Sequence, residues 1–370
     1  MSILFNNFYS PWSSLLKFYI DNLGTVRLRT SGDLDFSGAI DVDNNVLKSA
    51  YQSTGFEHAY FPDLETVSGS YAMSNFISGD TNLTSISFPK LETITGSYAM
   101  EYLCDGDSYL TSIDFSSLTS VGSYSLQYAF RNCTRLTSAN FSELTSIGNY
   151  GMQYAFYGDT SLTEVDFSSL TSVENYGLRY TFYNCSSLES IEFTNLISIS
   201  GTSVMEEAFT NCSSLKRISF PSLTAINGYN ACLDAFSFCY NLEQVSFPEL
   251  VSIEGYRAFC GALSCASDTT HPNVSLKTVV FNKLKIISGN EVMHYVFQNN
   301  SVLETVYFPK LESFPNNVFG SGEINYAFLR TPALKEIHFP AAIQSAIEAT
   351  TGYSTVWGHG ADSSIVRFDL

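Results

Sequence analysis

The sequence has no apolar run long enough to cross a membrane. A transmembrane helix needs about 18 or more uninterrupted apolar residues, and no stretch approaches that length. Near the N-terminus, Lys17 and Asp21 interrupt the one apolar segment, and it lacks the basic residues that precede the apolar part of a signal peptide. We therefore expect no membrane insertion and no signal peptide. An extracellular or virion-surface protein would then be released by lysis, and a cytoplasmic location stays open.

Basic residues are scarce. The chain carries 18 Lys and Arg residues against 36 Asp and Glu residues, which gives a formal net charge of −18. Such a surface repels phosphate groups, so we expect neither nucleic acid nor an anionic membrane surface as a partner. The same charge keeps a long chain soluble.

The motifs of common enzyme classes are also missing. The sequence contains no H-E-x-x-H, no nucleophile elbow, no Walker loop and no G-x-G-x-x-G in a suitable context. Serine is abundant, but as a filler of the repeat described below. We expect a protein that is not an enzyme, with no catalytic residues and no cofactor. The histidines lie in five unrelated contexts: His58, His271, His294, His338 and His359.

What the sequence does have is one pattern repeated many times. It is clearest over residues 110–122, L-T-S-I-D-F-S-S-L-T-S-V-G, which follow the template L-x-x-I-x-F-x-x-L-x-x-I-G. A fixed period of roughly 20–29 residues with this leucine spacing predicts a leucine-rich-repeat solenoid. The template phenylalanine recurs every 26 or 27 residues, apart from gaps of 34 and 31, at Phe61, Phe88, Phe115, Phe141, Phe167, Phe193, Phe220, Phe247, Phe281, Phe308 and Phe339.

Within each unit the pattern predicts a strand followed by a short helix. Side chains alternate along a strand, so Ile113 and Phe115 point into the core. Leu126 and Phe130 are four residues apart, which is the spacing of one helix face. Asparagine or glycine, such as Asn132, stands four residues before the next leucine, where the chain turns in a left-handed conformation. We expect an α/β repeat of about eleven 26–27-residue units, with parallel strands and short convex-side helices.

The repeat divides the chain into three parts. Residues 51–340 are expected to form the solenoid. A solenoid exposes a hydrophobic face at each end, so residues 1–50 and 341–370 are expected to cap it.

Each cap has its own local signals. Ser10, followed by a proline, is typical of a helix start, and the apolar spacing after it predicts a helix that ends at Gly24. Phe36 lies 25 residues before the first template phenylalanine, which indicates a decayed first repeat. At the C-terminus we expect a short helix over 343–350 and a closing strand over 365–368.

The leucine spacing, the I-G pair, and the A-F and N-C-x-x-L motifs resemble the BspA-like branch of leucine-rich repeats. The resemblance covers residues 56–340 and implies the solenoid fold. Two features depart from it: leucines such as Leu118 and Leu144 replace the asparagine of ordinary leucine-rich repeats, and the units are a few residues longer. Proteins similar in this way are bacterial surface or secreted binding proteins, and related repeats occur in phage tail proteins. The resemblance implies a class of protein and transfers no functional residue.

The cysteines favour a structural role. A metal site needs ligands that converge on a point, whereas residues at one template position are strung along an axis. We therefore expect buried, reduced thiols and no metal site. Cys260 and Cys265 are the best-placed pair for a disulfide. Four cysteines share one template position: Cys133, Cys185, Cys212 and Cys239.

Two units contain inserted residues. The gaps of 34 and 31 residues place these insertions at about 260–272 and at about 316–324. Insertions in repeat proteins emerge as loops on one face, which is often the binding face. Both segments are therefore candidate binding loops.

Tyrosines recur at two template positions, four residues apart. One interpretation packs them between neighbouring units with their hydroxyl groups in water. The other is an exposed aromatic column that stacks on a partner or a carbohydrate. The two sets are Tyr98, Tyr124, Tyr150, Tyr176 and Tyr102, Tyr128, Tyr154, Tyr180.

The solvent side of the strands offers the largest repeated array of exposed side chains. Like charges at one position of neighbouring strands repel, which favours a cation or a donor-rich ligand such as a glycan between them. The alternative is a solvated acidic face without a ligand. The candidate ligand-binding residues of this array are Asp114, Asn140, Glu164, Asp166, Glu192 and Tyr307.

Two functions follow from these observations. The first is a non-catalytic recognition or adhesion protein that presents a solenoid face to a protein or glycan partner on a cell surface, with a phage virion tail component as one version. The second is a structural spacer or scaffold with no ligand of its own. The sequence leaves the oligomeric state open.

Overall fold

The chain folds into two compact units, Met1–Leu170 and Thr171–Leu370. Both are parallel-strand β-solenoids, and together they contain about 11 coils. The computed structural model describes the chain apart from residues 1, 6–7, 12–17, 21–25, 29–32, 37, 51–55, 81, 266–274, 315–325, 351–352, 356, 358 and 360–362.

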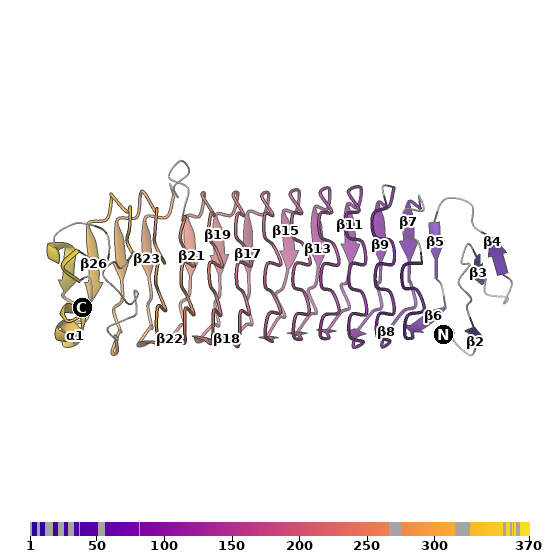
Figure 1. Ribbon diagram of the computed structural model, residues 1–370, viewed down its shortest axis with the longest axis horizontal. Helices are drawn as coiled ribbons and strands as arrows, with labels where there is room; N and C mark the ends of the chain where they lie inside the picture. The colour runs from indigo at the N-terminus through magenta and orange to yellow at the C-terminus, as the bar shows by residue number, and fades with distance from the viewer. Residues whose placement is uncertain are drawn as a thin grey trace. The chain divides into compact units, whose positions relative to one another are not determined.

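In the first unit, the first strand of each coil pairs in parallel with its counterparts in the neighbouring coils. Their order is β15-β13-β11-β9-β7-β5, and Figure 1 shows them side by side. Ile113 is in register with Ile86 on one side and with Ala139 on the other, so equivalent template positions are aligned. These strands are β5 (Asp33–Asp35), β7 (His58–Tyr60), β9 (Ser85–Ser87), β11 (Ser112–Asp114), β13 (Ser138–Asn140) and β15 (Glu164–Asp166).

A second, shorter strand in each coil forms another sheet of the first unit. Its order is β14-β12-β10-β8-β6, and antiparallel strands β1 and β2 continue it. Strands β3 and β4 form a separate antiparallel pair. The strands are β1 (Ser2–Phe5), β2 (Phe8–Pro11), β3 (Phe18–Ile20), β4 (Val26–Leu28), β6 (Ala39–Val42), β8 (Thr66–Val67), β10 (Thr93–Ile94), β12 (Ser120–Val121) and β14 (Ser146–Ile147).

The second unit follows the same plan. Its first strands form the sheets β17-β19-β21 and β23-β25-β26-β27, and its second strands form β18-β20-β22-β24. The first-strand sheets separate between β21 and β23, where the 34-residue repeat lies. The strands are β16 (Ser172–Val173), β17 (Ser190–Glu192), β18 (Ser198–Ser200), β19 (Arg217–Ser219), β20 (Ala225–Asn227), β21 (Gln244–Ser246), β22 (Ser252–Glu254), β23 (Thr278–Val280), β24 (Ile286–Ser288), β25 (Thr305–Tyr307), β26 (Glu336–Phe339) and β27 (Val366–Phe368).

The core follows from the alternation of strand side chains. Ile113 and Phe115 are buried, while Asp114 between them reaches the surface, as predicted. Phe115 stacks between Phe88 and Phe141, with ring centroids 5.1 and 5.4 Å apart. Burial of each such side chain contributes roughly 1.5–3 kcal/mol. The stack of template phenylalanines therefore holds neighbouring coils together.

The predicted convex-side helices are wrong. After the second strand, the chain forms successive turns, in which Tyr124, Tyr128 and Asn132 have φ angles of +60°, +57° and +61°. A right-handed α-helix of L-residues requires negative φ at every position. Leu126 and Phe130 are both buried nonetheless, because a turn repeated every four residues also places them on one side. The repeat is therefore a β-solenoid and not an α/β repeat.

The backbone groups of the turns form hydrogen bonds both to the next coil and within their own coil. The amides of Tyr124, Leu126 and Tyr128 donate to carbonyls of the next coil over 2.8–3.0 Å. The residues between them donate to carbonyls three positions earlier in the same coil. Every amide of the run is satisfied without a helix. Gly106 and Gly158, both at φ +79°, confirm the predicted left-handed turn before the next leucine.

The N-terminal helix predicted from Ser10 is also wrong. The described residues of this segment form β2 and β3, while 12–17 and 21–25 lie outside the described residues. A short apolar run rich in aromatic and β-branched residues fits a strand as well as a helix. Strand β5 pairs in parallel with β7, and Phe36 stacks on Phe61 at 4.4 Å, so the coil of Phe36 has the plan of the others.

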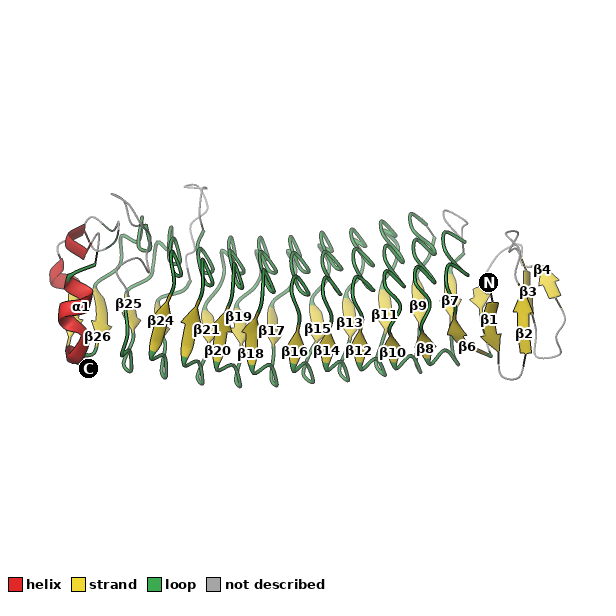
Figure 2. Cartoon of the chain, turned by 60° about the horizontal axis from the view of Figure 1, so that its bottom comes forward, coloured by secondary structure: helices red, strands yellow, loops and turns green. Residues whose placement is uncertain are grey.

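The C-terminal segment contains the predicted elements. Helix α1 (Gln344–Glu348) lies within the expected helical stretch, and Figure 2 shows it in red. Strand β27 occupies the expected closing strand and pairs with β26. Trp357 is fully buried against Phe339. In the described part of this segment, short 3₁₀ turns lie at Ala341–Ile343, Tyr353–Thr355 and Ser363–Ile365.

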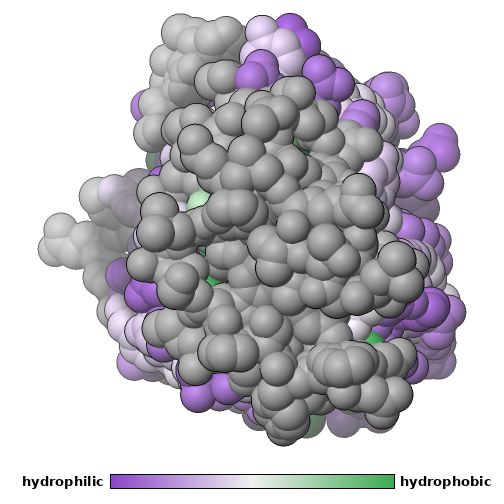
Figure 3. All heavy atoms as spheres, turned by 90° about the vertical axis from the view of Figure 1, so that its right-hand side faces the viewer, coloured by the Kyte–Doolittle hydropathy of each residue, from purple (hydrophilic) through white to green (hydrophobic). Residues whose placement is uncertain are grey.

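Other expectations meet the limits of the described chain. Most of both inserted segments lies outside the described residues, at 266–274 and 315–325. In the described part of the chain, no helix is long and apolar enough to cross a membrane. The described residues visible in Figure 3 are mostly hydrophilic.

Candidate functional site

Four of the six candidate residues lie together on the strand face of the first unit. Asp114 of β11 is in register with Asn140 of β13, which is in register with Asp166 of β15. We call these three residues the acidic column. Glu164 lies two positions before Asp166, is exposed, and is in register with Ser138. Since paired strands are roughly 4.8 Å apart, the column is a continuous row of polar groups.

The acidic column also has a structural role, which the sequence analysis missed. The Oδ1 atoms of Asp114, Asn140 and Asp166 each accept the backbone amide two residues later, over 3.0, 3.0 and 2.9 Å. Aspartate and asparagine form such Asx turns, and here the turn ends the strand. The turn fixes the orientation of each side chain, which still reaches the surface.

The other two candidates lie in the second unit and in different settings. Glu192 of β17 is exposed and in register with Ser219. Tyr307 of β25 is in register with Val280, and its ring stacks on His338 with centroids 4.5 Å apart. One is therefore a carboxylate beside a serine, and the other is part of an aromatic stack.

The tyrosines of the first unit form two stacks. Their ring centroids are 4.5–4.9 Å apart in the set from Tyr71 to Tyr150 and 4.7–4.8 Å in the set from Tyr102 to Tyr154. The rings lie face to face. Carbohydrates stack on ring faces, which are occupied here. This geometry favours packing between neighbouring coils.

Arg131 neutralises charge within this tyrosine surface. Its guanidinium lies 5.6 Å from the ring centroid of Tyr102 and 5.0 Å from that of Tyr128. It also donates two hydrogen bonds to Asp105, over 2.9 and 2.8 Å. A bidentate pair of this kind fixes the guanidinium. The surface therefore presents aromatic edges and a paired charge.

A ladder of buried polar side chains runs along the turns, at the template position shared by the cysteines. Asp107 accepts the amide of Asp80 over 2.6 Å, and Asp159 accepts the amide of Cys133 over 2.8 Å. Asn300 donates to the carbonyl of Leu263 over 2.8 Å. Each of these bonds joins two coils. The polar side chains at this template position therefore help to hold neighbouring coils together.

Two carboxyl groups of this ladder are held protonated by burial. Burial raises the pKa of Asp107 to about 8 and raises that of Asp159 as well. Both side chains are fully buried, and among the described residues the Oδ2 atom of each has no hydrogen-bond partner. A buried carboxylate without a cation is costly, so the neutral acid is the stable form near neutral pH.

The cysteines are buried thiols. Within the described residues, Cys260 and Cys265, the pair best placed for a disulfide in the sequence, are buried thiols that form no disulfide. The Sγ atoms of Cys133 and Cys212 donate to carbonyls of the preceding coil over 3.1 Å. Burial raises the pKa of both thiols, which makes them inert. Their role in the described chain is structural.

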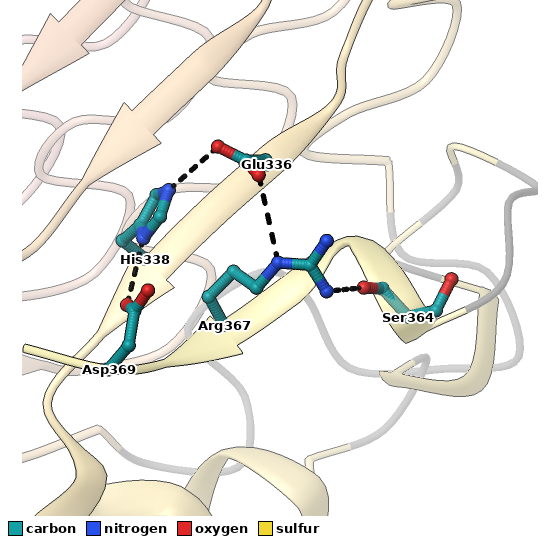
Figure 4. A network of polar contacts seen from close by, with 5 residues as sticks. All are labelled: Glu336, His338, Ser364, Arg367 and Asp369. Atoms are coloured by element: carbon teal, nitrogen blue, oxygen red, sulfur yellow. Dashed lines mark hydrogen bonds and ion pairs between the residues drawn. The ribbon is translucent and has the colours of Figure 1, made fainter.

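A polar network at the end of the second unit was not found from the sequence. His338 of β26 is only 8 % exposed and lies between two carboxylates, as Figure 4 shows. Its Nδ1 atom is 2.9 Å from Asp369, and its Nε2 atom is 3.2 Å from Glu336. Glu336 is also 3.7 Å from Arg367 of β27. The sequence contained one signal for this network: the predicted closing strand, which brings Arg367 beside His338.

The groups of the acidic column can form hydrogen bonds and ion pairs with a partner. Within the described residues, no three His, Cys, Asp or Glu side chains converge as metal ligands. The acidic column offers carboxylate and amide groups in a row, held by Asx turns. Such a row suits a partner that carries several hydrogen-bond donors or positive charges.

Solved structures that are similar to this chain include proteins with leucine-rich repeats. A leucine-rich repeat protein of T. pallidum is 19% identical over 50% of this chain and 77% of its own, with a TM-score of 0.36. A leucine-rich cell surface protein of Faecalibacterium prausnitzii is 15% identical over 86% and 92%, with a TM-score of 0.32. The pneumococcal vaccine antigen PcpA is 15% identical over 85% and 82%, with a TM-score of 0.34. No curated protein matches the chain.

A family model matches most of the repeat region. The model of the BspA type leucine-rich repeat region, with six copies of the repeat, matches residues 44–178, 126–265 and 202–325. These matches overlap and together cover more than half of the chain. The resemblance drawn from the leucine spacing is therefore confirmed. The chain belongs to the BspA-type leucine-rich repeat family.

Proposed function

We propose that the chain is a non-catalytic recognition protein that binds a protein or glycan on a cell surface through the strand face of its first unit. The acidic column is the observation that supports this proposal. Its side chains are already oriented by Asx turns, so a partner does not have to order them.

The column determines the chemistry of the partner. Asp114 and Asp166 present negative acceptors, and Asn140 between them adds an amide that also donates. Hydroxyl groups of a glycan, or lysine and arginine side chains of a protein, complement such a row. The net charge of −18 steers basic partners toward the chain.

The site of action follows from the same proposal. Membership of the BspA-type family supports a cell-surface protein, and a phage virion tail component is the finer version. Antibodies against the full chain, applied to intact source cells and to purified virions, distinguish the two. Labelling confined to the cytoplasm of opened cells contradicts both.

The test of binding removes charge without changing shape. The double variant Asp114→Asn/Asp166→Asn keeps the acceptor of each Asx turn and loses two negative charges. We expect binding of the labelled chain to a glycan array and to source cells to fall about tenfold or more. Glu143→Gln removes an exposed charge outside the column in the same unit, and should bind like the parent chain.

A structural spacer is the second candidate. The Asx turns favour it, because they give the acidic column a role in the fold that needs no ligand. If the double variant binds every probe as the parent chain does, the column is structural and the recognition proposal fails.

A further inference from the structure

Among the described strands of the second unit, the last one is short and pairs on one side only. Strand β27 has three residues and pairs in parallel with β26 through Ile337 and Val366, His338 and Arg367, and Phe339 and Phe368. A strand of this length has few backbone hydrogen bonds, so its attachment depends on side chains. The side chains that cross this pair are those of Figure 4.

His338 faces a carboxylate with each ring nitrogen. Nδ1 lies 2.9 Å from Asp369 Oδ1, and Nε2 lies 3.2 Å from Glu336 Oε2. A neutral imidazole carries one N–H and can satisfy one of the two carboxylates. Its other nitrogen then directs a lone pair at a negative oxygen. The doubly protonated ring donates to both, and such charge-assisted bonds are the stronger kind.

The surrounding groups favour the same protonation state. On β26 the neighbouring charge is Glu336, and from the β27 side Arg367 and Asp369 approach. On β25, Tyr307 places the face of its ring on the imidazole. With His338 protonated, the cluster has no net charge. With His338 neutral, the cluster has a net charge of −1. Its two carboxylates then flank an imidazole that is nearly excluded from water.

We propose that His338 is a pH-sensitive clasp that holds β27 against β26. Protonated, the ring links Glu336 of β26 to Asp369, which directly follows β27. Deprotonated, it releases one carboxylate, and the last strand opens more often. Histidine is the side chain that changes charge between about pH 5 and 8, so the clasp responds within that range.

His58 provides a matched control within the chain. It is also on a first strand and half-buried, but its Nδ1 atom lies 2.8 Å from Ser85 Oγ and 3.1 Å from Thr84 Oγ1. A hydroxyl group can donate or accept, so it accommodates either state of the ring. A change of pH should therefore not loosen the strand that carries His58.

Hydrogen exchange of the full chain tests the clasp. Protection of the amides of 366–370 is measured at about pH 5.5 and about pH 8, each corrected for intrinsic exchange. We expect the protection factor to fall about tenfold between the two pH values. In His338→Gln the protection factor of these amides should be the same at both pH values. His58→Gln should behave as the parent chain.

Two further variants keep the proposal testable if His338→Gln does not fold. Glu336→Gln and Asp369→Asn alter side chains that are 42% and 54% exposed, so the fold should tolerate them. Each should reduce the pH dependence, because one carboxylate no longer favours the protonated ring. Equal protection at both pH values in the parent chain contradicts the clasp, as does unchanged pH dependence in His338→Gln or in both carboxylate variants.

Discussion

The strand side and the turn side of a coil use the same kind of sequence and differ in backbone conformation. On the strand side, Ile113 and Phe115 alternate with polar residues; Ile113 is in register with the neighbouring coils, and Phe115 stacks on their phenylalanines. On the turn side, Leu126 and Phe130 are also buried, and Leu126 also donates to the next coil. Between them, however, Tyr128 has a φ of +57°. Burial and hydrogen bonding between coils therefore do not require one type of secondary structure.

The difference shows what an apolar period can and cannot identify. Apolar residues at every second position have few physical explanations other than a strand. Apolar residues at every fourth position fit one face of a helix. They fit a turn that repeats every four residues equally well. The second case was correct here, because left-handed positions recur every four residues, as at Tyr124, Tyr128 and Asn132. The turns were not predicted because Tyr124 and Tyr128 occupy two of these positions, and tyrosine rarely adopts a left-handed conformation.

The largest expected effect tests whether both sides are equally part of the core. Phe115→Ala on the strand side and Phe130→Ala on the turn side both empty a fully buried site. Each should lower the free energy of unfolding by about 3–5 kcal/mol, measured by urea denaturation. A loss below about 1 kcal/mol for Phe130→Ala alone would show that the turn side is loosely packed and would break the comparison.

The second prediction concerns the buried carboxyl of Asp107 on the turn side. Its pKa is about 8 in the fold, because of burial, and about 3.9 in an unfolded chain. The folded state therefore binds the proton more tightly. This contribution to stability is complete below about pH 4, and it is lost as the pH rises toward 8, where the folded carboxyl also ionises.

The variant Asp107→Asn removes this titration. Relative to the parent chain, its free energy of unfolding should rise by about 4 kcal/mol between pH 5 and pH 8, measured in urea at each pH. Asp114→Asn, on the strand side and at the surface, is the matched control and should track the parent chain. If both variants give the same pH profile, Asp107 does not titrate as a buried group.

The strand side could be predicted from the sequence, and the turn side only in part. Alternation alone placed Ile113, Phe115 and the acidic column correctly, because in-register parallel strands align equal template positions. The conformation of Tyr124 and Tyr128 could not be predicted, since it depends on hydrogen bonds to the next coil. The cluster around His338 was missed because it joins residues that are far apart in the sequence.

The third prediction separates a turn from a helix at Asn132. This residue is exposed at φ +61°. In a left-handed position, Asn132→Ala should cost about 1 kcal/mol, whereas Asn132→Gly should stay within about 0.5 kcal/mol of the parent chain. In a helix the order would be reversed, because alanine is the better helix former. Thermal unfolding of the two variants decides, and a more stable alanine variant contradicts the turn.

The smallest expected effect concerns the acidic column on the strand side. Asp114→Asn keeps the oxygen that accepts the amide two residues later, as Asn140 does naturally in the next coil. Its stability should stay within about 0.5 kcal/mol of the parent chain. Asp114→Ala loses that acceptor and should cost about 0.5–1.5 kcal/mol, because a net hydrogen bond is worth about that much. If both variants are equally stable in urea, the Asx turn contributes nothing, and the conformation of the column at the end of the strand has to come from the backbone alone.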